Sequence, residues 1–163
     1  MVDRRNSPRR HLNRLAPLPR HTHGELGDTI TASGDRRFAV GDRITARAPN
    51  RNLHVQGDRR SYVRNGALGT ITAVAVDGDS EDSMTVDFDG IGTIELPRSF
   101  FDHHRTAAGR VEVGIDHAYA LTSYAVQGST RSVSTSRVDA TATRAETYVD
   151  ITRGRNANHL YLT

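Results

Sequence analysis

The chain has 163 residues with a formal net charge of +3, and its hydrophobic residues make up only 36%, which leaves material for a thin core. It contains no Cys, so disulfides, thiolate metal sites and cysteine nucleophiles are excluded. All 22 basic residues are Arg, and without Lys the chain can form neither a Schiff base nor a Walker A phosphate loop of its own.

Residues 1–23 are predicted to form a disordered, basic arm. The first 20 residues hold six Arg, one acidic residue and three Pro, a composition typical of disordered segments. They lack the apolar region of a secretory signal, and no apolar run in the chain approaches the roughly 18–20 residues that cross a bilayer. We therefore expect a cytoplasmic protein with no membrane partner.

Residues 24–105 are predicted to form a small all-β domain. Alternating segments, separated by Gly, Asp and Asn turns, lie at 38–47, 67–76, 84–88 and 92–96. Four or five short strands of this kind are typical of an SH3-like barrel. A short helical turn at 97–103 is expected to close it.

Charge is distributed unevenly over this domain. Residues 36–64 hold eight Arg against two acidic residues, whereas residues 77–95 hold seven acidic residues and no Arg. The basic stretch is either a phosphate-contacting face or an ordinary solvated surface, and charge alone leaves both interpretations open.

Residues 106–163 change from strands alone to strands that alternate with helices. Strands are predicted at 115–121, 132–138 and 159–163, and helices at 122–128 and 143–152. In the second helix Thr143 and Glu146 have the spacing of a capping box. This order favours a parallel α/β layer. Because parallel sheets need helices on both faces, we expect this layer to be part of a larger sheet.

Two segments of this last part resemble motifs of superfamily 1 DNA helicases. DHAYALTSYAVQGST at 116–130 resembles motif V, and YVDITRGR at 148–155, followed by HLYL at 159–162, resembles motif VI. The likeness is closest to the RecD-like branch, which includes the helicase half of conjugative relaxases.

The upstream part agrees with the same family. FAVGDRI at 38–44, NRN at 50–52 and VRNGALGT at 63–70 resemble the segment that enters a small SH3-like insertion in the second RecA-like domain. The resemblance covers about residues 24–163. It implies an α/β fold, in which a partial RecA-like (P-loop NTPase type) parallel sheet at 106–163 carries the SH3-like barrel at 24–105.

The resemblance also implies a nucleotide-binding role for residues of both motifs. Arg153 matches the arginine finger, which contacts the γ-phosphate of ATP across a cleft between two RecA-like domains and stabilises the transition state. Arg155 is the supporting cation. The nucleotide-binding residues expected on this basis are Gln127, Gly128, Thr130, Arg153 and Arg155.

A second group of residues is expected to bind DNA. Thr122 and Tyr124 match the family's DNA-contacting Thr and His. Because Tyr replaces His at 124, this side chain can stack on a base but cannot carry a positive charge. The candidate DNA contacts in the basic domain are Arg47, Asn50, Arg51 and Asn65.

Simpler structural explanations exist for several of these residues. Arg153 and Arg155 suit the C-terminus of a helix as ordinary solvated cations, and Tyr124 could be a half-buried core aromatic. Asn65 and the Gly after it are most simply a hairpin turn. The other tyrosines expected in the core are Tyr119, Tyr148 and Tyr161. The scattered His residues are not expected to bind a metal.

Neither Walker motif is present in the sequence. The resemblance therefore implies the C-terminal part of an ATP-dependent DNA helicase without its motor half. Its expected partners are single-stranded DNA and a domain that carries a Walker A motif. ATP with magnesium is the cofactor expected for the complete helicase, and the isolated chain is expected to bind no cofactor and to be catalytically silent. Two alternatives stay open, namely a free-standing nucleic-acid-binding SH3-like module without ATPase activity and a non-functional remnant.

Overall fold

The computed structural model describes residues 6–76, 82–105, 111–126 and 130–162. The chain forms two compact units. The terminal unit combines residues 1–16 with residues 119–163, and the inserted unit, residues 17–118, lies between them in the sequence. The domain boundaries expected from the sequence follow residues 23 and 105, whereas the compact units divide after residues 16 and 118.

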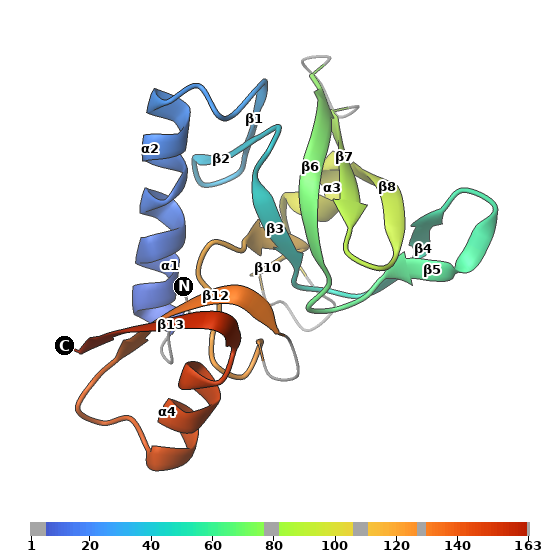
Figure 1. Cartoon of the computed structure of the whole chain (residues 1–163). Helices are drawn as coiled ribbons and strands as arrows, with labels where there is room; N and C mark the ends of the chain where they lie inside the picture. The colour runs from blue at the N-terminus through green and yellow to red at the C-terminus, as the bar shows by residue number, and fades with distance from the viewer. Residues whose placement is uncertain (1–5, 77–81, 106–110, 127–129, 163) are drawn as a thin grey trace. The chain divides into compact units, whose positions relative to one another are not determined.

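The inserted unit is built on a five-stranded antiparallel sheet (Figure 1). In the order in which they lie side by side, its strands are β11 (Ile115–His117), β3 (Arg43–Ala46), β6 (Leu68–Ala75), β7 (Ser83–Phe88) and β8 (Gly92–Pro97). The alternating segments of the sequence are therefore confirmed as strands. In β7 the side chains of Met84, Val86 and Phe88 are buried and alternate with more exposed ones, as one face of a half-buried strand requires.

Smaller elements surround this sheet. They are α2 (Pro17–Thr22), the pair β1 (Thr29–Ala32) and β2 (Arg36–Ala39), the pair β4 (Asn50–Val55) and β5 (Asp58–Val63), α3 (Arg98–Phe101), and the pair β9 (His103–Arg105) and β10 (Val111–Val113). Figure 1 shows the β4–β5 hairpin projecting beyond β8. In the described part of the chain these strands form separate sheets and no closed barrel, so the SH3-like barrel is not confirmed.

The main hydrophobic core belongs to the inserted unit. Its largest fully buried side chains include Phe38, Phe88 and Phe101. Gly69 in β6 leaves room for the Val86 side chain of β7. An added Cβ at Gly69 would lie 2.6 Å from that side chain. The turn before β3 is closed by Asp42, whose buried carboxylate accepts a hydrogen bond of 2.8 Å from the backbone N–H of Ala39.

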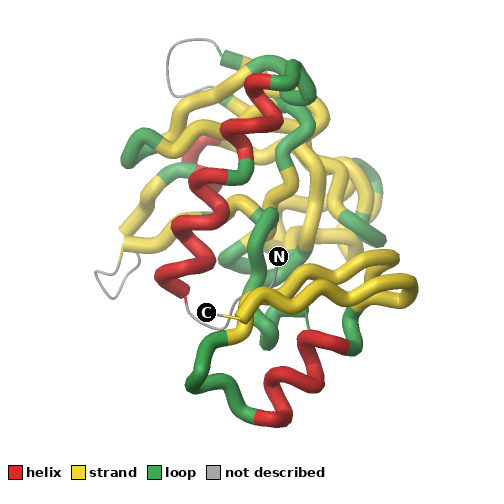
Figure 2. The backbone as a smooth tube through the Cα atoms, turned by 60° about the vertical axis from the view of Figure 1, so that its left-hand side comes forward, coloured by secondary structure: helices red, strands yellow, loops and turns green. Residues whose placement is uncertain are grey.

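The terminal unit consists of α1 (Asn6–Leu15), β12 (Arg131–Val138), α4 (Arg144–Ile151) and β13 (Gly154–Leu162). Strands β12 and β13 run parallel, and α4 connects them and lies against them (Figure 2). The predicted capping box of α4 is present, with Thr143 and Glu146 each bonding to the other's backbone N–H. The parallel strand–helix–strand layer is therefore confirmed for this part.

Two predictions for the end of the chain are corrected. The strand near 115 was expected in the parallel layer, but β11 pairs antiparallel with β3 because Ile115 is completely buried in the core of the inserted unit. The helix predicted at 122–128 is a turn over residues 123–126. Residues 127 and 128 lie outside the described residues.

The prediction of a disordered arm is wrong for residues 6–22, which form α1 and α2. The prolines taken as signs of disorder fall at the first turns of helices, Pro8 in α1 and Pro17 in α2, where a missing N–H is tolerated. A buried hydrogen-bonded contact of Asn13 also ties α1 to residue 120. Among the described residues, no helix is long and apolar enough to cross a membrane.

Candidate nucleic-acid and nucleotide sites

The segment that resembles motif V makes a tight turn at Thr122. The backbone N–H of Val126 donates to the Thr122 carbonyl at 3.2 Å, and the N–H of Ala125 donates to the Thr122 hydroxyl oxygen at 3.3 Å. Thr122 thus caps a single helical turn, as a Thr N-cap does. Gln127 and Gly128 lie beyond the described residues, so their role stays a prediction. Thr130 is exposed directly before β12.

This turn directs Tyr124 into solvent. The residue is 87% exposed, while Ser123 and Val126 beside it are buried. The interpretation of Tyr124 as a half-buried core aromatic is therefore wrong. An aromatic ring held on an ordered turn in this way is available for stacking on a base.

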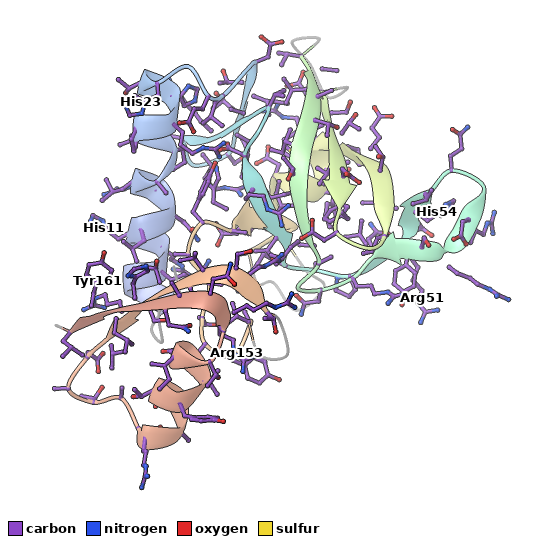
Figure 3. The ribbon with its side chains drawn as sticks, viewed as in Figure 1. His11, His23, Arg51, His54, Arg153 and Tyr161 are labelled. Carbon is purple, nitrogen blue, oxygen red and sulfur yellow. The ribbon has the colours of Figure 1, made fainter. Side chains whose placement is uncertain are left out.

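Arg153 lies at the end of α4 (Figure 3). Its Nε donates to the Val149 carbonyl at 3.0 Å, and its Nη2 donates to the Thr152 hydroxyl at 3.1 Å. This arrangement agrees with the simpler explanation of Arg153, namely a cation that hydrogen-bonds to the last carbonyls of a helix. A guanidinium has five N–H donors, so a role as arginine finger would use N–H groups other than these two or would exchange these hydrogen bonds for a phosphate.

Arg155 differs from Arg153 in its surroundings. It is exposed on β13. Its guanidinium group forms no ion pair or hydrogen bond with any residue that the structure describes. Arg155 can therefore bind an anion without breaking a contact to a described residue.

Eight arginines of the inserted unit fall into two groups, while Arg36 donates to backbone carbonyls and Arg37 is exposed on β2 without an ion pair to a described residue. On the body of the unit Arg20 pairs with Glu25 at 3.0 Å, Arg43 pairs with Asp89 at 2.6 Å, and Arg98 pairs with Asp82. On and beside the β4–β5 hairpin the arginines are exposed and form no ion pair with the described residues; these five, which we call the hairpin arginines, are Arg47, Arg51, Arg59, Arg60 and Arg64. The charge of this second group is available to an external anion.

Tyr62 organises part of the hairpin. The guanidinium carbons of Arg51 and Arg64 lie 5.2 Å and 5.3 Å from the centroid of its ring, within the range of cation–π attraction. This attraction keeps two like charges near one ring. Figure 3 shows Arg51 at the base of the hairpin. Sequence reasoning did not find Tyr62, because the pairing of β4 with β5 contains register shifts.

Asp58 stabilises the hairpin turn through local hydrogen bonds and forms no ion pair with the hairpin arginines. Hydrogen bonds from the side chain of Ser61 and the backbone N–H of Arg60 lower the pKa of its carboxyl group below 3.8. Asn50 likewise makes a local bond, accepting from the N–H of Asn52 at 2.9 Å. Asn65 is exposed before Gly66, whose φ is 82°. Among the described strands, β5 before this turn and β6 after it do not pair with each other, so the prediction of a hairpin turn is wrong.

The terminal unit buries little of its apolar surface. Among its described residues only Ala120, Val126 and Val138 are buried hydrophobics. Its exposed large hydrophobic residues are Leu15, Tyr124, Val133, Tyr148, Ile151, Leu160, Tyr161 and Leu162. The expectation that Tyr148 and Tyr161 lie in the core is wrong, since they are 65% and 58% exposed.

Comparison with known proteins shows that the chain is similar in fold to part of a helicase. No protein-family model matches the chain, and no curated protein matches it. The Pif1 helicase of Candida albicans superposes on 99% of the chain with a TM-score of 0.57 and 16% identity. The Pif1 helicase of Bacteroides in complex with ADP-AlF3 and ssDNA superposes on 99% with a TM-score of 0.56 and 16% identity.

A further structure of Bacteroides Pif1, bound to ssDNA, covers 88% of the chain with a TM-score of 0.52 and 18% identity. The chain has the fold of part of a Pif1 helicase. The likeness agrees with the expected helicase-type fold and does not distinguish the RecD-like branch from other helicases. The chain spans about two fifths of the length of these helicases, 43% of the Candida protein and 39% of the Bacteroides one.

Proposed function

We propose that the chain is the C-terminal part of an ATP-dependent DNA helicase of superfamily 1, of RecD-like or conjugative-relaxase type. The observation that carries the proposal is that residues 119–126 of the motif V-like segment and the whole motif VI-like segment belong to one compact unit, within a chain that has the fold of part of a Pif1 helicase over nearly its whole length. A β-rich unit inserted between residues 16 and 119 also supports it, because the family carries an insertion in its second RecA-like domain.

The exposed apolar residues of the terminal unit support a role beside a second lobe. Its parallel sheet has two strands, β12 and β13, and one connecting helix, α4. Parallel sheets are normally buried on both faces, yet Tyr148, Tyr161 and Leu162 are exposed. We propose that a lobe carrying the Walker A motif covers this surface in the complete helicase.

This chain is proposed to form one side of an ATP-binding site. Arg155 and Arg153 supply cations that bind phosphate oxygens and stabilise the charge that develops during hydrolysis. Among the described residues no group of three or more His, Asp or Glu could hold a metal ion. Magnesium would supply further charge neutralisation at the phosphates, and we propose that the partner lobe holds it.

The proposal is tested by ATP hydrolysis with a Walker-A-bearing lobe supplied in trans or as a fusion, in the presence of single-stranded DNA. Hydrolysis is expected only when both parts are present, and Arg153→Ala should lower kcat by about 10³-fold or more. Arg144→Ala is the matched control, because Arg144 is exposed at the start of α4, the helix that Arg153 follows. An unchanged rate for Arg153→Ala would contradict the arginine-finger role.

A second function, a free-standing nucleic-acid-binding module, is favoured by the hairpin arginines alone. These five exposed cations belong to the inserted unit, which has its own core and does not need the motif residues. Under this alternative the isolated chain binds DNA in a salt-dependent way that Arg153→Ala does not change, and no added lobe yields ATPase activity.

A further inference from the structure

Asn13 makes a paired contact with a backbone position far away in the sequence. Its Nδ2 donates to the Ala120 carbonyl at 3.0 Å, and the backbone N–H of Ala120 donates to its Oδ1 at 2.6 Å. The two residues are 107 positions apart and belong to the same compact unit. Asn13 is 2% exposed and Ala120 1%, so both hydrogen bonds are shielded from water.

This contact supplies hydrogen-bond partners to the backbone of Ala120, which lies outside the strands. Strand β11 ends at His117 and β12 begins at Arg131, so Ala120 belongs to no strand. Buried backbone N–H and C=O groups need partners, and the amide of Asn13 supplies one for each. Only a side chain with a donor and an acceptor side by side, and of this length, can do so.

The position it fixes leads directly into the candidate DNA-contacting turn. Ala120 stands two residues before Thr122, the cap of that turn, and four before the exposed Tyr124. Two hydrogen bonds within the turn are long, at 3.2 and 3.3 Å. The direction in which Tyr124 leaves the unit therefore depends on where the backbone at 120 is fixed.

We infer that Asn13 is a positioning residue for single-stranded DNA binding, which orients Thr122 and Tyr124 by fixing the backbone of Ala120. The inference rests on the proposed function for the identity of the ligand. It gives the N-terminal helix α1 a defined task in the motif V-like segment of the same unit. Asn13 itself touches no DNA in this arrangement.

The test uses the full chain and three substitutions. Asn13→Leu removes both hydrogen bonds, Asn13→Asp keeps the acceptor for the Ala120 N–H but removes the donor, and His11→Leu is the matched control. His11 is exposed on the same helix (Figure 3), so this control introduces the same side chain without touching the contact. Because the chain contains no Trp, Tyr124→Trp provides a single fluorescent reporter on the turn.

Two readouts need no DNA, namely the hydrogen-exchange rate of the Ala120 amide and the fluorescence anisotropy of the reporter at 124. A third is the dissociation constant for a labelled oligothymidine, measured with Tyr124 in place. Asn13→Leu is expected to accelerate exchange, lower the anisotropy and weaken DNA binding about tenfold, the loss expected for one or two hydrogen bonds. Asn13→Asp should give intermediate values, and His11→Leu should match the parent chain.

Each outcome decides between the alternatives. Unchanged exchange and anisotropy in Asn13→Leu would overturn the inference. Changed exchange with unchanged DNA affinity would also overturn it, because Asn13 would then hold α1 in place and do no more. If Asn13→Leu does not fold, Asn13→Asp decides by the same readouts. If the parent chain binds no DNA, the proposed function fails, while exchange and anisotropy still decide whether Asn13 orients the turn.

Discussion

Replacing hairpin arginines by Gln is expected to remove a defined share of the salt dependence of DNA binding. Arg51, Arg59, Arg60 and Arg64 are exposed and unpaired among the described residues, so each can neutralise one phosphate. On single-stranded DNA each such contact contributes about 0.7 to the slope of log K against log salt, and four contribute about 2.8. Raising salt from about 50 to about 200 mM then weakens binding about 50-fold through these four contacts alone.

The assay is fluorescence anisotropy of a labelled oligothymidine across a salt series. The quadruple Gln variant should lose about 2.8 from the slope and each single variant about 0.7. Arg20→Gln is the matched control, because it removes the same charge from a residue already paired with Glu25 at 3.0 Å. A quadruple variant with the parent slope, or a control that lowers the slope as much as Arg59→Gln, would show that the hairpin arginines do not contact the phosphates.

Three further predictions concern the elements that carry the candidate sites. Hydrogen bonds lower the pKa of the Asp58 carboxyl group below 3.8. The ionised carboxylate therefore stabilises the hairpin at pH values above 3.8, and this effect is lost as the pH falls through the folded-state pKa. An NMR titration midpoint at or above 3.8 would argue against these hydrogen bonds. Thr143→Ala should destabilise α4 by about 1 kcal/mol while Thr143→Ser should not, as urea denaturation followed by circular dichroism will measure; equal stabilities would mean that the capping box contributes nothing. Gly69→Ala would bring a Cβ within 2.6 Å of Val86 and should lower the free energy of unfolding by about 1–3 kcal/mol; an unchanged urea midpoint would show that the sheet can adjust.

Local sequence signals predicted the elements that depend on local physics. The alternation at 84–88 became β7 because one face of that strand packs on the core. The spacing of Thr143 and Glu146 gave the capping box, since both partners lie within one turn of helix. The charge contrast also located the hairpin arginines, although it did not say which of the eight arginines at 36–64 would be paired.

What sequence reasoning missed depends on contacts between distant residues. The helix α1 was taken for disorder because the bond that ties it down, from Asn13 to Ala120, spans 107 positions. β11 was assigned to the wrong sheet because its partner, β3, lies some 70 positions earlier. Tyr148 and Tyr161 were expected in a core that the described residues do not provide.

The central claim, that this chain contacts single-stranded DNA through the motif V-like turn and the basic hairpin, is tested most directly by photocrosslinking. A bromodeoxyuridine oligonucleotide is irradiated with the full chain, and the modified peptides are identified by mass spectrometry. We expect adducts at Tyr124 and within residues 47–65, which disappear as salt is raised. Adducts confined to other parts of the chain, or none at low salt, would contradict it.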